Sequence, residues 1–236
     1  MFIFKRFVNE LAMTQAMLAD FLNNVNQLLC TKEILRIAIA TGSTLEKFLQ
    51  ALQTENIPFQ KIDLYIVDEY AGFSYTDPRS CTFDLYSLLN GKTTDFHSIK
   101  VFSAENYKKE VDKYNAELTT NGLDICVLGI GSDGHVGFCY PPVRHISDTY
   151  YEITELSEKR KSEHVANEWL PSIDSVPDNV ITLSLWGIKQ SSIIMIGAIY
   201  EKKKNIIQQM HKKEILPPYC PVLYLNEHKD ITVYIG

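Results

Sequence analysis

The feature that most constrains the fold is a set of short runs that are apolar at almost every position and alternate with helical segments. A strand that is apolar on both faces has to be covered on both faces, which is typical of parallel sheets. The sequence therefore predicts an α/β fold: a doubly wound, mostly parallel sheet with helices on both faces, of the Rossmann-like type. The runs are LRIAIA (35–40), DLYIV (63–67), DICVLGIG (124–131) and SIIMIG (192–197).

The helices are predicted from apolar residues that recur every three or four positions. Residues 9–30 carry such a pattern and are predicted to form an outer helix packed on the sheet. Other helices are expected directly after residue 44, over 106–121, and from about Glu201 in a Lys-rich segment. Further strands are expected at the N-terminal MFIFKRFVNE and at 98–102, 180–186 and 231–236.

The domain organisation is predicted to be simple. No internal repeat, Pro/Gly/Ser-rich linker or change in composition divides the chain, so residues 1–236 are interpreted as one domain. Residues 143–172 are more polar than their surroundings and are predicted to form a lid or a helical excursion.

Composition excludes several classes of protein. The net charge of −6 argues against nucleic acid or an anionic membrane surface as the main partner. Apolar stretches are interrupted within about ten residues, which is too short for a membrane-spanning helix. The N-terminus has no signal-peptide pattern, and the five cysteines are too far apart for a disulfide framework or a metal knuckle. A cytoplasmic location is therefore expected.

The first candidate site follows a predicted strand at ATGST (40–44). A glycine flanked by hydroxyl residues at a strand-to-helix turn offers backbone N–H groups, side-chain donors and the positive end of a helix dipole. Thr41, Gly42, Ser43 and Thr44 therefore suit a phosphate group. The alternative is that they only cap the following helix.

The second candidate site is VDEYAG (67–72), where two adjacent carboxylates follow an apolar strand. Neighbouring side chains on an extended chain point in opposite directions. One of Asp68 and Glu69 is therefore expected to enter a site on a given face. A solvated turn is the alternative interpretation.

The third candidate site is GIGSDGHVGF (129–138), where Gly131 and Gly134 allow a tight turn around Asp133 and His135. A histidine held by a carboxylate is suited to proton transfer near neutral pH. Because no further His or Cys cluster lies nearby, we predict no metal site.

The same segment also matches the glycine pattern of a dinucleotide site, Gly129-x-Gly131-x-x-Gly134. That pattern normally opens a helix after the first strand of a fold. Here it lies past mid-chain and is soon followed by Pro141 and Pro142, so no nucleotide cofactor is predicted.

Taken in this order and spacing, the motifs resemble the superfamily of glucosamine-6-phosphate deaminases and 6-phosphogluconolactonases. The resemblance covers nearly the whole chain, and DEYAG followed by DPRS (77–80) is similar to the deaminase branch. The matching segments are ATGST (40–44), DEYAG (68–72), GIGSDGH (129–135), VPDNVITLSL (176–185) and SIIMIGAIYEK (192–202).

The resemblance implies a small-molecule hexose 6-phosphate as substrate and no cofactor. Asp68 would move a proton between C2 and C1 of an amino sugar, and His135, oriented by Asp133, would act as the ring-opening acid and base. Deamination then leaves a ketose phosphate and ammonia. The implied phosphate ligands are Thr41, Gly42, Ser43, Thr44 and Lys202, and further substrate contacts are assigned to Glu69, Gly131, Gly134 and Arg144.

Two departures from the deaminase pattern matter. Tyr140 stands where deaminases have a glutamate that pairs with the histidine, and lactonases have an aromatic residue there. A tyrosine can form hydrogen bonds at that position but carries no charge at neutral pH. The residue aligned with the phosphate-binding arginine is Glu168, and Arg144, Arg160 and Lys161 are candidate replacements.

Three functions therefore stay open. An amino-sugar 6-phosphate isomerase/deaminase is favoured by DEYAG, and Tyr140 is interpreted as catalytic in it. A lactonase is favoured by Tyr140, with His135 activating water. Loss of both the Glu and the Arg would suit a regulator that binds a sugar phosphate without turning it over. The protein is expected to be a monomer or a homo-oligomer.

Overall fold

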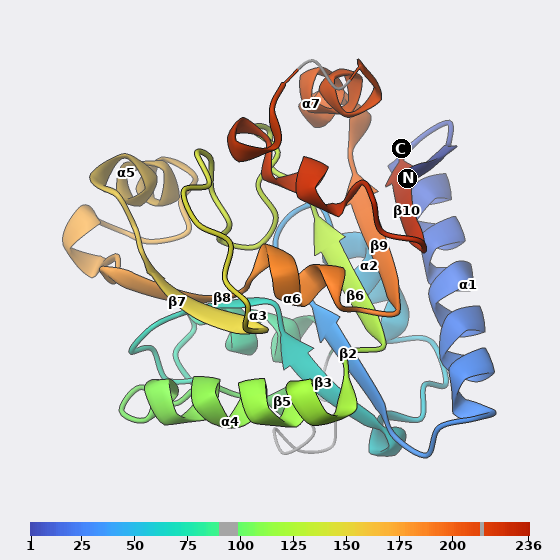
Figure 1. Cartoon of the computed structure of the whole chain (residues 1–236), viewed down its shortest axis with the longest axis horizontal. Coiled ribbons are helices and arrows are strands. Elements are labelled where there is room, and N and C mark those ends of the chain that lie inside the picture. Colours follow the sequence, from blue (N-terminus) through green and yellow to red (C-terminus); the bar gives the residue numbers. More distant parts are fainter. Residues whose placement is uncertain (90–98, 213–214) are drawn as a thin grey trace.

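The main sheet has the predicted parallel architecture. The computed structural model describes residues 1–89, 99–212 and 215–236. In this part of the chain seven strands pair in parallel in the order β1-β10-β9-β6-β2-β3-β5, as Figure 1 shows. Their bounds are β1 Ile3–Arg6, β2 Leu35–Ile39, β3 Ile62–Ile66, β5 Ile99–Lys100, β6 Ile125–Gly129, β9 Ile193–Ala198 and β10 Ile231–Ile235.

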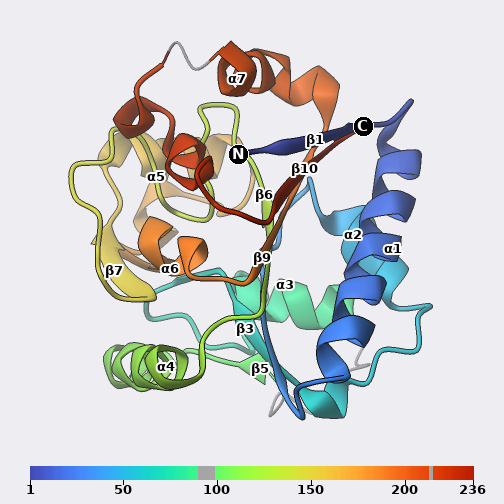
Figure 2. The ribbon, with the colours of Figure 1, turned by 45° about the vertical axis from the view of Figure 1, so that its right-hand side comes forward.

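Helices cover both faces of this sheet, as expected for a doubly wound fold. Figure 2 views the sheet nearly edge-on, with α1 and α2 on one side and α4 and α6 on the other. The helices are α1 Glu10–Leu29, α2 Glu46–Leu52, α3 Cys81–Leu88, α4 Tyr107–Asn121, α5 Glu158–Ala166, α6 Leu185–Lys189 and α7 Tyr200–Lys212. Polar residues start several of them: the side chains of Asn9, Ser80, Ser157 and Ser184 cap α1, α3, α5 and α6.

A second, smaller sheet was not predicted. The strands β4 (Asp68–Tyr70), β8 (Asn179–Leu183) and β7 (Tyr151–Glu155) pair antiparallel. The segment 180–186, predicted as one strand, instead contributes to β8 and to α6, because Ser184 ends the strand and caps the helix. The segment 143–172 contains β7 and α5, so it is an excursion with regular structure of its own.

The two sheets meet at Val67. Its N–H donates to Ile39 O in the parallel sheet, and its carbonyl accepts from Leu183 N in the small sheet. The buried Tyr151 hydroxyl adds a bond to Ile66 O at 2.6 Å. The chain therefore leaves the parallel sheet at Val67 and enters the antiparallel one at Asp68, which places Asp68 at the junction.

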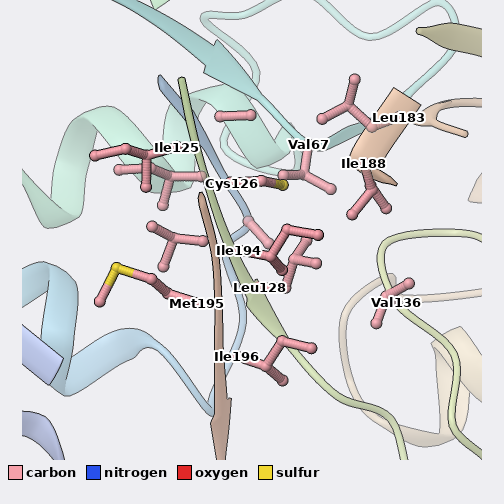
Figure 3. Close-up of a cluster of buried hydrophobic side chains, with 14 of the residues drawn as sticks. Val67, Ile125, Cys126, Leu128, Val136, Leu183, Ile188, Ile194, Met195 and Ile196 are labelled. Atoms are coloured by element: carbon pink, nitrogen blue, oxygen red, sulfur yellow. The ribbon is translucent and has the colours of Figure 1, made fainter. Parts of the chain in front are cut away.

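The core is built on the two central strands, β6 and β9. Successive side chains of a strand point to opposite faces. Figure 3 shows Ile125 and Met195 on one side of the strands and Leu128, Ile194 and Ile196 on the other. All five side chains are at most 1% exposed. Because both faces of these strands are buried, the runs that encode them are apolar throughout.

Candidate active site

A cavity of about 720 Å³ lies at the carboxyl ends of β2 and β6, where loops of a parallel sheet converge. β4 and the first turn of α7 complete it. All three sequence motifs contribute to its lining. The predicted site residues that line it are Thr41, Gly42, Ser43, Thr44, Asp68, Gly131, His135, Tyr140 and Lys202.

One end of the cavity is rich in donors. Gly42 has a φ of +100°, a backbone conformation that favours glycine, and this turn carries Ser43 into the lining. Lys202 and Lys203, both on α7, line the same cavity. Lys203 is half-buried, and burial lowers the pKa of its ammonium group. Two lysines and a hydroxyl-rich turn suit an anionic group such as a phosphate.

Substitution of these lysines tests that assignment. Replacing either Lys202 or Lys203 by alanine is expected to raise KM for a sugar phosphate about tenfold, with kcat within about threefold, because a charge-assisted bond to the anion is lost. Lys204→Ala is the matched control, since Lys204 is exposed and does not line the cavity. Steady-state kinetics check this, and an unchanged KM in both variants would contradict it.

Asp68 faces the cavity with a perturbed carboxyl group. Burial, and then the charge of Glu69, raise its pKa from 3.8 to about 7. Such a carboxyl is present in both protonation states near neutral pH. It can therefore take a proton from carbon and return it.

Glu69 does not line the cavity, and its assignment as a substrate contact stays a prediction. Its carboxylate is buried and turned away from Asp68, into the N-terminus of α3. It accepts hydrogen bonds from Ser80 Oγ (2.6 Å), Thr82 N (2.9 Å) and Cys81 N (3.1 Å). A carboxylate that accepts such hydrogen bonds satisfies N–H groups at the start of a helix that would otherwise be unpaired. Glu69 therefore has a structural role.

Glu69→Gln is accordingly expected to destabilise the fold. Both carboxylate oxygens accept bonds, so an amide NH₂ in place of one of them would face N–H donors and cost about 2 kcal/mol. Urea unfolding measures the change. Glu46→Gln, at an exposed position in the first turn of α2, is the control. Unchanged stability together with a raised KM would instead support Glu69 as a substrate contact.

His135 is held by Asp133, as predicted. His135 Nδ1 lies 2.6 Å from Asp133 Oδ1, and Arg160 donates to Asp133 Oδ2 at 2.8 Å. Burial raises the pKa of the Asp133 carboxyl, but the hydrogen bonds from His135 and Arg160 outweigh it and hold that pKa well below its usual range. An ionised carboxylate only accepts, so Nδ1 carries the proton and Nε2 is left as a proton acceptor.

The two glycines around this pair have different roles. A Cβ at Gly131 would lie 2.1 Å from the His135 ring, so the close approach of the ring requires a glycine there. Gly134 has a φ of +83° and packs against Cys220 and Ile206. Gly134 does not line the cavity, and its assignment as a substrate contact stays a prediction.

Tyr140 lines the cavity beside His135, with ring centroids 4.7 Å apart. Its ring also lies over the Arg160 guanidinium, 4.2 Å from centroid to carbon. Its hydroxyl is bonded to His164 Nε2 at 2.8 Å. The position that carries a glutamate in the deaminase pattern is thus part of an uncharged hydrogen-bond system.

The assignment of Arg144 as a substrate contact likewise stays a prediction. Arg144 is exposed and does not line the cavity. Among the candidate replacements, Arg160 contacts Asp133, and Lys161 pairs with Asp178 and Glu158 away from the site. Glu168 also lies outside the lining, because the turn that contains it directs its neighbours Asn167 and Trp169 into the cavity.

Several lining residues were missed from the sequence. Tyr70 lies within a predicted motif, and its alternation with Asp68 along β4 could have indicated it. Others enter from the start of α3, from the loop after β6, from the turn after α5 and from α7, and they were not named as site residues from the sequence. They are Arg79, Ser80, Cys81, Asp84, Phe138, Asn167, Trp169 and Lys203.

Over 1–89, 99–212 and 215–236, no group of three or more His, Cys, Asp and Glu side chains is placed to hold a metal ion. Within the same ranges, no helix has the length and apolar character needed to cross a bilayer.

The fold and this cavity define an α/β enzyme in which Asp68, His135 and Tyr140 line a cavity at the carboxyl ends of the parallel strands. The chain belongs to the family described as glucosamine-6-phosphate isomerases/6-phosphogluconolactonase, whose model matches residues 9–233. The resemblance seen in the sequence is thereby confirmed.

Individual relatives support the same placement. The chain is 31% identical to glucosamine-6-phosphate deaminase 1 of Bacillus subtilis (strain 168) over 208 residues, which cover 84% of each chain. A solved monomeric glucosamine-6-phosphate deaminase superposes with a TM-score of 0.82 at 25% identity, covering 98% of this chain and 96% of the other. A 6-phosphogluconolactonase from Thermotoga maritima shares the fold, with a TM-score of 0.78 at 17% identity over 100% and 99% of the two chains.

Proposed function

We propose that this enzyme converts glucosamine 6-phosphate, or a closely related amino-sugar 6-phosphate, to a ketose 6-phosphate and ammonia. The observation that carries the proposal is the Asp68 carboxyl, which faces the cavity with a pKa of about 7. The Asp133-held imidazole of His135 lines the same cavity. Relatives that bear the deaminase name support this choice of reaction.

The first step is ring opening. Neutral His135 takes the proton of the anomeric hydroxyl on Nε2 and returns it to the ring oxygen, which breaks the C1–O5 bond and leaves an open-chain aldehyde. Asp133 stabilises the transient imidazolium, since Arg160 holds its carboxylate in the ionised state.

The second step is proton transfer between carbons. The Asp68 carboxylate takes the C2 proton of the aldehyde and delivers it to C1, while a proton passes from the C2 amine to O1. The C2 amine thereby becomes an imine and C1 a hydroxymethyl carbon. Addition of water to that imine releases ammonia and forms the C2 ketone. Thr41–Thr44, Lys202 and Lys203 bind the phosphate group and thereby fix the sugar relative to Asp68.

A second candidate function is lactone hydrolysis, which Tyr140 favours. In that reaction His135 Nε2 removes a proton from water, which attacks the ester carbonyl of a sugar-phosphate lactone. No base at C2 is needed. A catalytically weakened sugar-phosphate-binding protein is the further alternative, for which binding without product formation would be the evidence.

The deciding experiment supplies the pure protein with glucosamine 6-phosphate and, in parallel, with 6-phosphogluconolactone. Joint appearance of fructose 6-phosphate and ammonia supports the deaminase proposal. Hydrolysis of the lactone alone would replace it with the lactonase. If neither reaction occurs, thermal stabilisation by the sugar phosphate would support a binding role.

The pH dependence follows from the state of Asp68. The base must be ionised, so kcat/KM for the amino sugar is expected to fall as the pH decreases through about 7, the raised pKa of this carboxyl. Glu69→Gln should move this acid limb to lower pH, because the Glu69 charge contributes to the raised pKa. A limb that stays near pH 4 in the wild-type protein would contradict the assignment.

We extend the proposal to the location and partners of the protein. We place the protein in the cytoplasm, where a hexose 6-phosphate is its small-molecule partner and no nucleic acid or membrane takes part. The five cysteines are free thiols, which fits a reducing compartment. The chain is proposed to act as a monomer or a homo-oligomer.

A further inference from the structure

His164 is a buried histidine that is hydrogen-bonded at both ring nitrogens. It lies on α5 and is 1% exposed. Nδ1 is 2.8 Å from the hydroxyl of Tyr70, on β4, and Nε2 is 2.8 Å from the hydroxyl of Tyr140, in the loop after β6. Three segments far apart in the sequence thus contribute one chain of hydrogen bonds, which we call the Tyr-His-Tyr triad.

The surroundings keep this imidazole neutral. The rings of Phe138 and Trp169 pack on it, with centroids 5.6 and 4.9 Å away. Burial, and then repulsion from the protonated form of His135, lower the pKa of His164 to about 4, although Glu163 acts in the opposite direction. At neutral pH the ring therefore carries one N–H and one unprotonated nitrogen.

The Tyr-His-Tyr triad therefore contains one phenol O–H that donates to no other member of the triad. The unprotonated nitrogen accepts from one phenol, and the N–H donates to the other, which keeps its own O–H. Among the described residues, neither phenol oxygen has a hydrogen-bond partner besides His164. Since Tyr70 and Tyr140 both line the cavity, the free O–H is available to a molecule bound there.

The hydroxyl acts as a hydrogen-bond donor and not as an acid. Burial raises the pKa of both phenols above the ordinary value of 10. Tyr140 is the member of the triad that packs on His135, with ring centroids 4.7 Å apart. A donor at this place is well positioned for a substrate oxygen next to the atoms on which His135 acts.

We propose that His164 is a positioning residue that holds Tyr140 so that its O–H donates to the substrate oxygen that gains negative charge during the reaction. This inference rests on the proposed function, in which that oxygen is O1 as Asp68 removes the C2 proton. The carbonyl oxygen of a lactone gains charge in the same way when water attacks it. The triad thus supplies a neutral, pre-oriented donor at the position where the deaminase pattern has a carboxylate.

The kinetic test uses a double-mutant cycle. His164→Phe keeps a ring of similar size but removes both hydrogen bonds, and Tyr140→Phe removes only the hydroxyl. Each variant is expected to lower kcat about 10- to 100-fold, with KM within about threefold, on whichever substrate the wild-type protein turns over. Because both changes disable one donor, the double variant should be no slower than the slower single variant.

A rescue variant separates positioning from packing. A glutamine side chain has one donor and one acceptor group, so His164→Gln is expected to recover at least about fivefold of the kcat lost in His164→Phe. Full activity of Tyr140→Phe, or losses that multiply in the double variant, would overturn the proposal. Tyr140→Phe keeps the test valid even where His164→Phe does not fold.

A second measurement does not depend on turnover. The ¹⁵N NMR spectrum of the histidine-labelled full chain at pH 6 is expected to show His164 as a neutral ring protonated at Nε2, the tautomer that donates to Tyr140 and leaves the Tyr140 O–H free. The signal is assigned by its loss in His164→Phe, and protonation at Nδ1 instead would overturn the role given to Tyr140. An imidazolium signal there would overturn the proton count. If neither sugar is converted, the proposed function fails while this spectrum still tests the triad.

Discussion

Replacing Asp68 by asparagine is expected to reduce kcat for the amino-sugar phosphate by about 10²- to 10⁴-fold, the usual contribution of a positioned general base. An amide has nearly the shape of the carboxyl but cannot take the C2 proton. KM should change little, because the substitution leaves the turn at 41–44 and the lysines of α7, which are proposed to bind the phosphate, unchanged. Coupled assays of fructose 6-phosphate and ammonia measure the loss.

The same substitution is expected to stabilise the fold. Folding raises the pKa of Asp68 from 3.8 to about 7, so its ionised form is disfavoured in the native state, and stability is lost as the pH rises through this window. The shift corresponds to about 4 kcal/mol, which screening by the open cavity reduces to about 2 kcal/mol at pH 8. Thermal unfolding at pH 8 should therefore occur at a higher temperature in Asp68→Asn.

Asp84→Asn is the matched control, because Asp84 also lines the cavity and burial also raises the pKa of its carboxyl, whereas no role in the proton transfer is assigned to it. It should retain most of the kcat. Lactone hydrolysis that persists in Asp68→Asn, with no deaminase activity in the wild-type protein, would assign the cavity to the lactonase reaction.

Gly131→Ala is expected to have an effect of similar size without touching a reacting group. The new Cβ would lie 2.1 Å from the His135 ring, so the imidazole has to leave its position against Asp133. Loss of a placed acid–base group lowers kcat by about 10²- to 10⁴-fold. Steady-state kinetics and the circular dichroism spectrum together show whether activity is lost while the fold is kept.

A cycle with His135→Ala identifies the cause. If the added methyl group acts by displacing the imidazole, then Gly131→Ala costs little once the imidazole is absent, and the two losses do not multiply. A Gly131→Ala variant with wild-type kcat would show that the ring has room to move and that its present position is not required.

The parallel fold could be predicted because each buried strand is marked by the residues of its own short segment. Buried strands such as 35–40 and 124–131 are apolar at nearly every position, and β2 and β6 lie there. The small antiparallel sheet could not be predicted, because it depends on the pairing of Asp68–Tyr70 with a strand more than a hundred residues later. Such pairing leaves little pattern in a three-residue segment.

The candidate site was predicted where its residues follow strands. Asp68, His135 and the turn at 41–44 come directly after parallel strands, which converge at one edge by the geometry of the fold. His164 and Trp169 could not be predicted in this way. His164 lies on α5, outside the parallel sheet, and Trp169 follows this helix. Only the tertiary structure brings Trp169 into the cavity lining and His164 against the hydroxyls of Tyr70 and Tyr140.

The role of Glu69 could not be predicted for a different reason. Alternation predicted that at most one of the two adjacent carboxylates enters a site on a given face, and Asp68 is the one that lines the cavity, but the sequence alone did not show what Glu69 binds. Its partners at the start of α3, the Ser80 hydroxyl and the N–H groups of Cys81 and Thr82, lie 11 to 13 residues away. Adjacent acidic residues can thus belong to different functions, one chemical and one structural.

The placement of α5 outside the parallel sheet has a consequence for how such an enzyme can diverge. Arg160, His164 and Trp169 reach the site from this excursion, whereas Asp68 and His135 are held at the ends of core strands. Insertions or substitutions in the excursion leave the hydrogen-bonded strands of the parallel sheet undisturbed. Selection can therefore alter which sugar is accepted while the proton-transfer groups stay fixed, so that a new specificity requires no new scaffold.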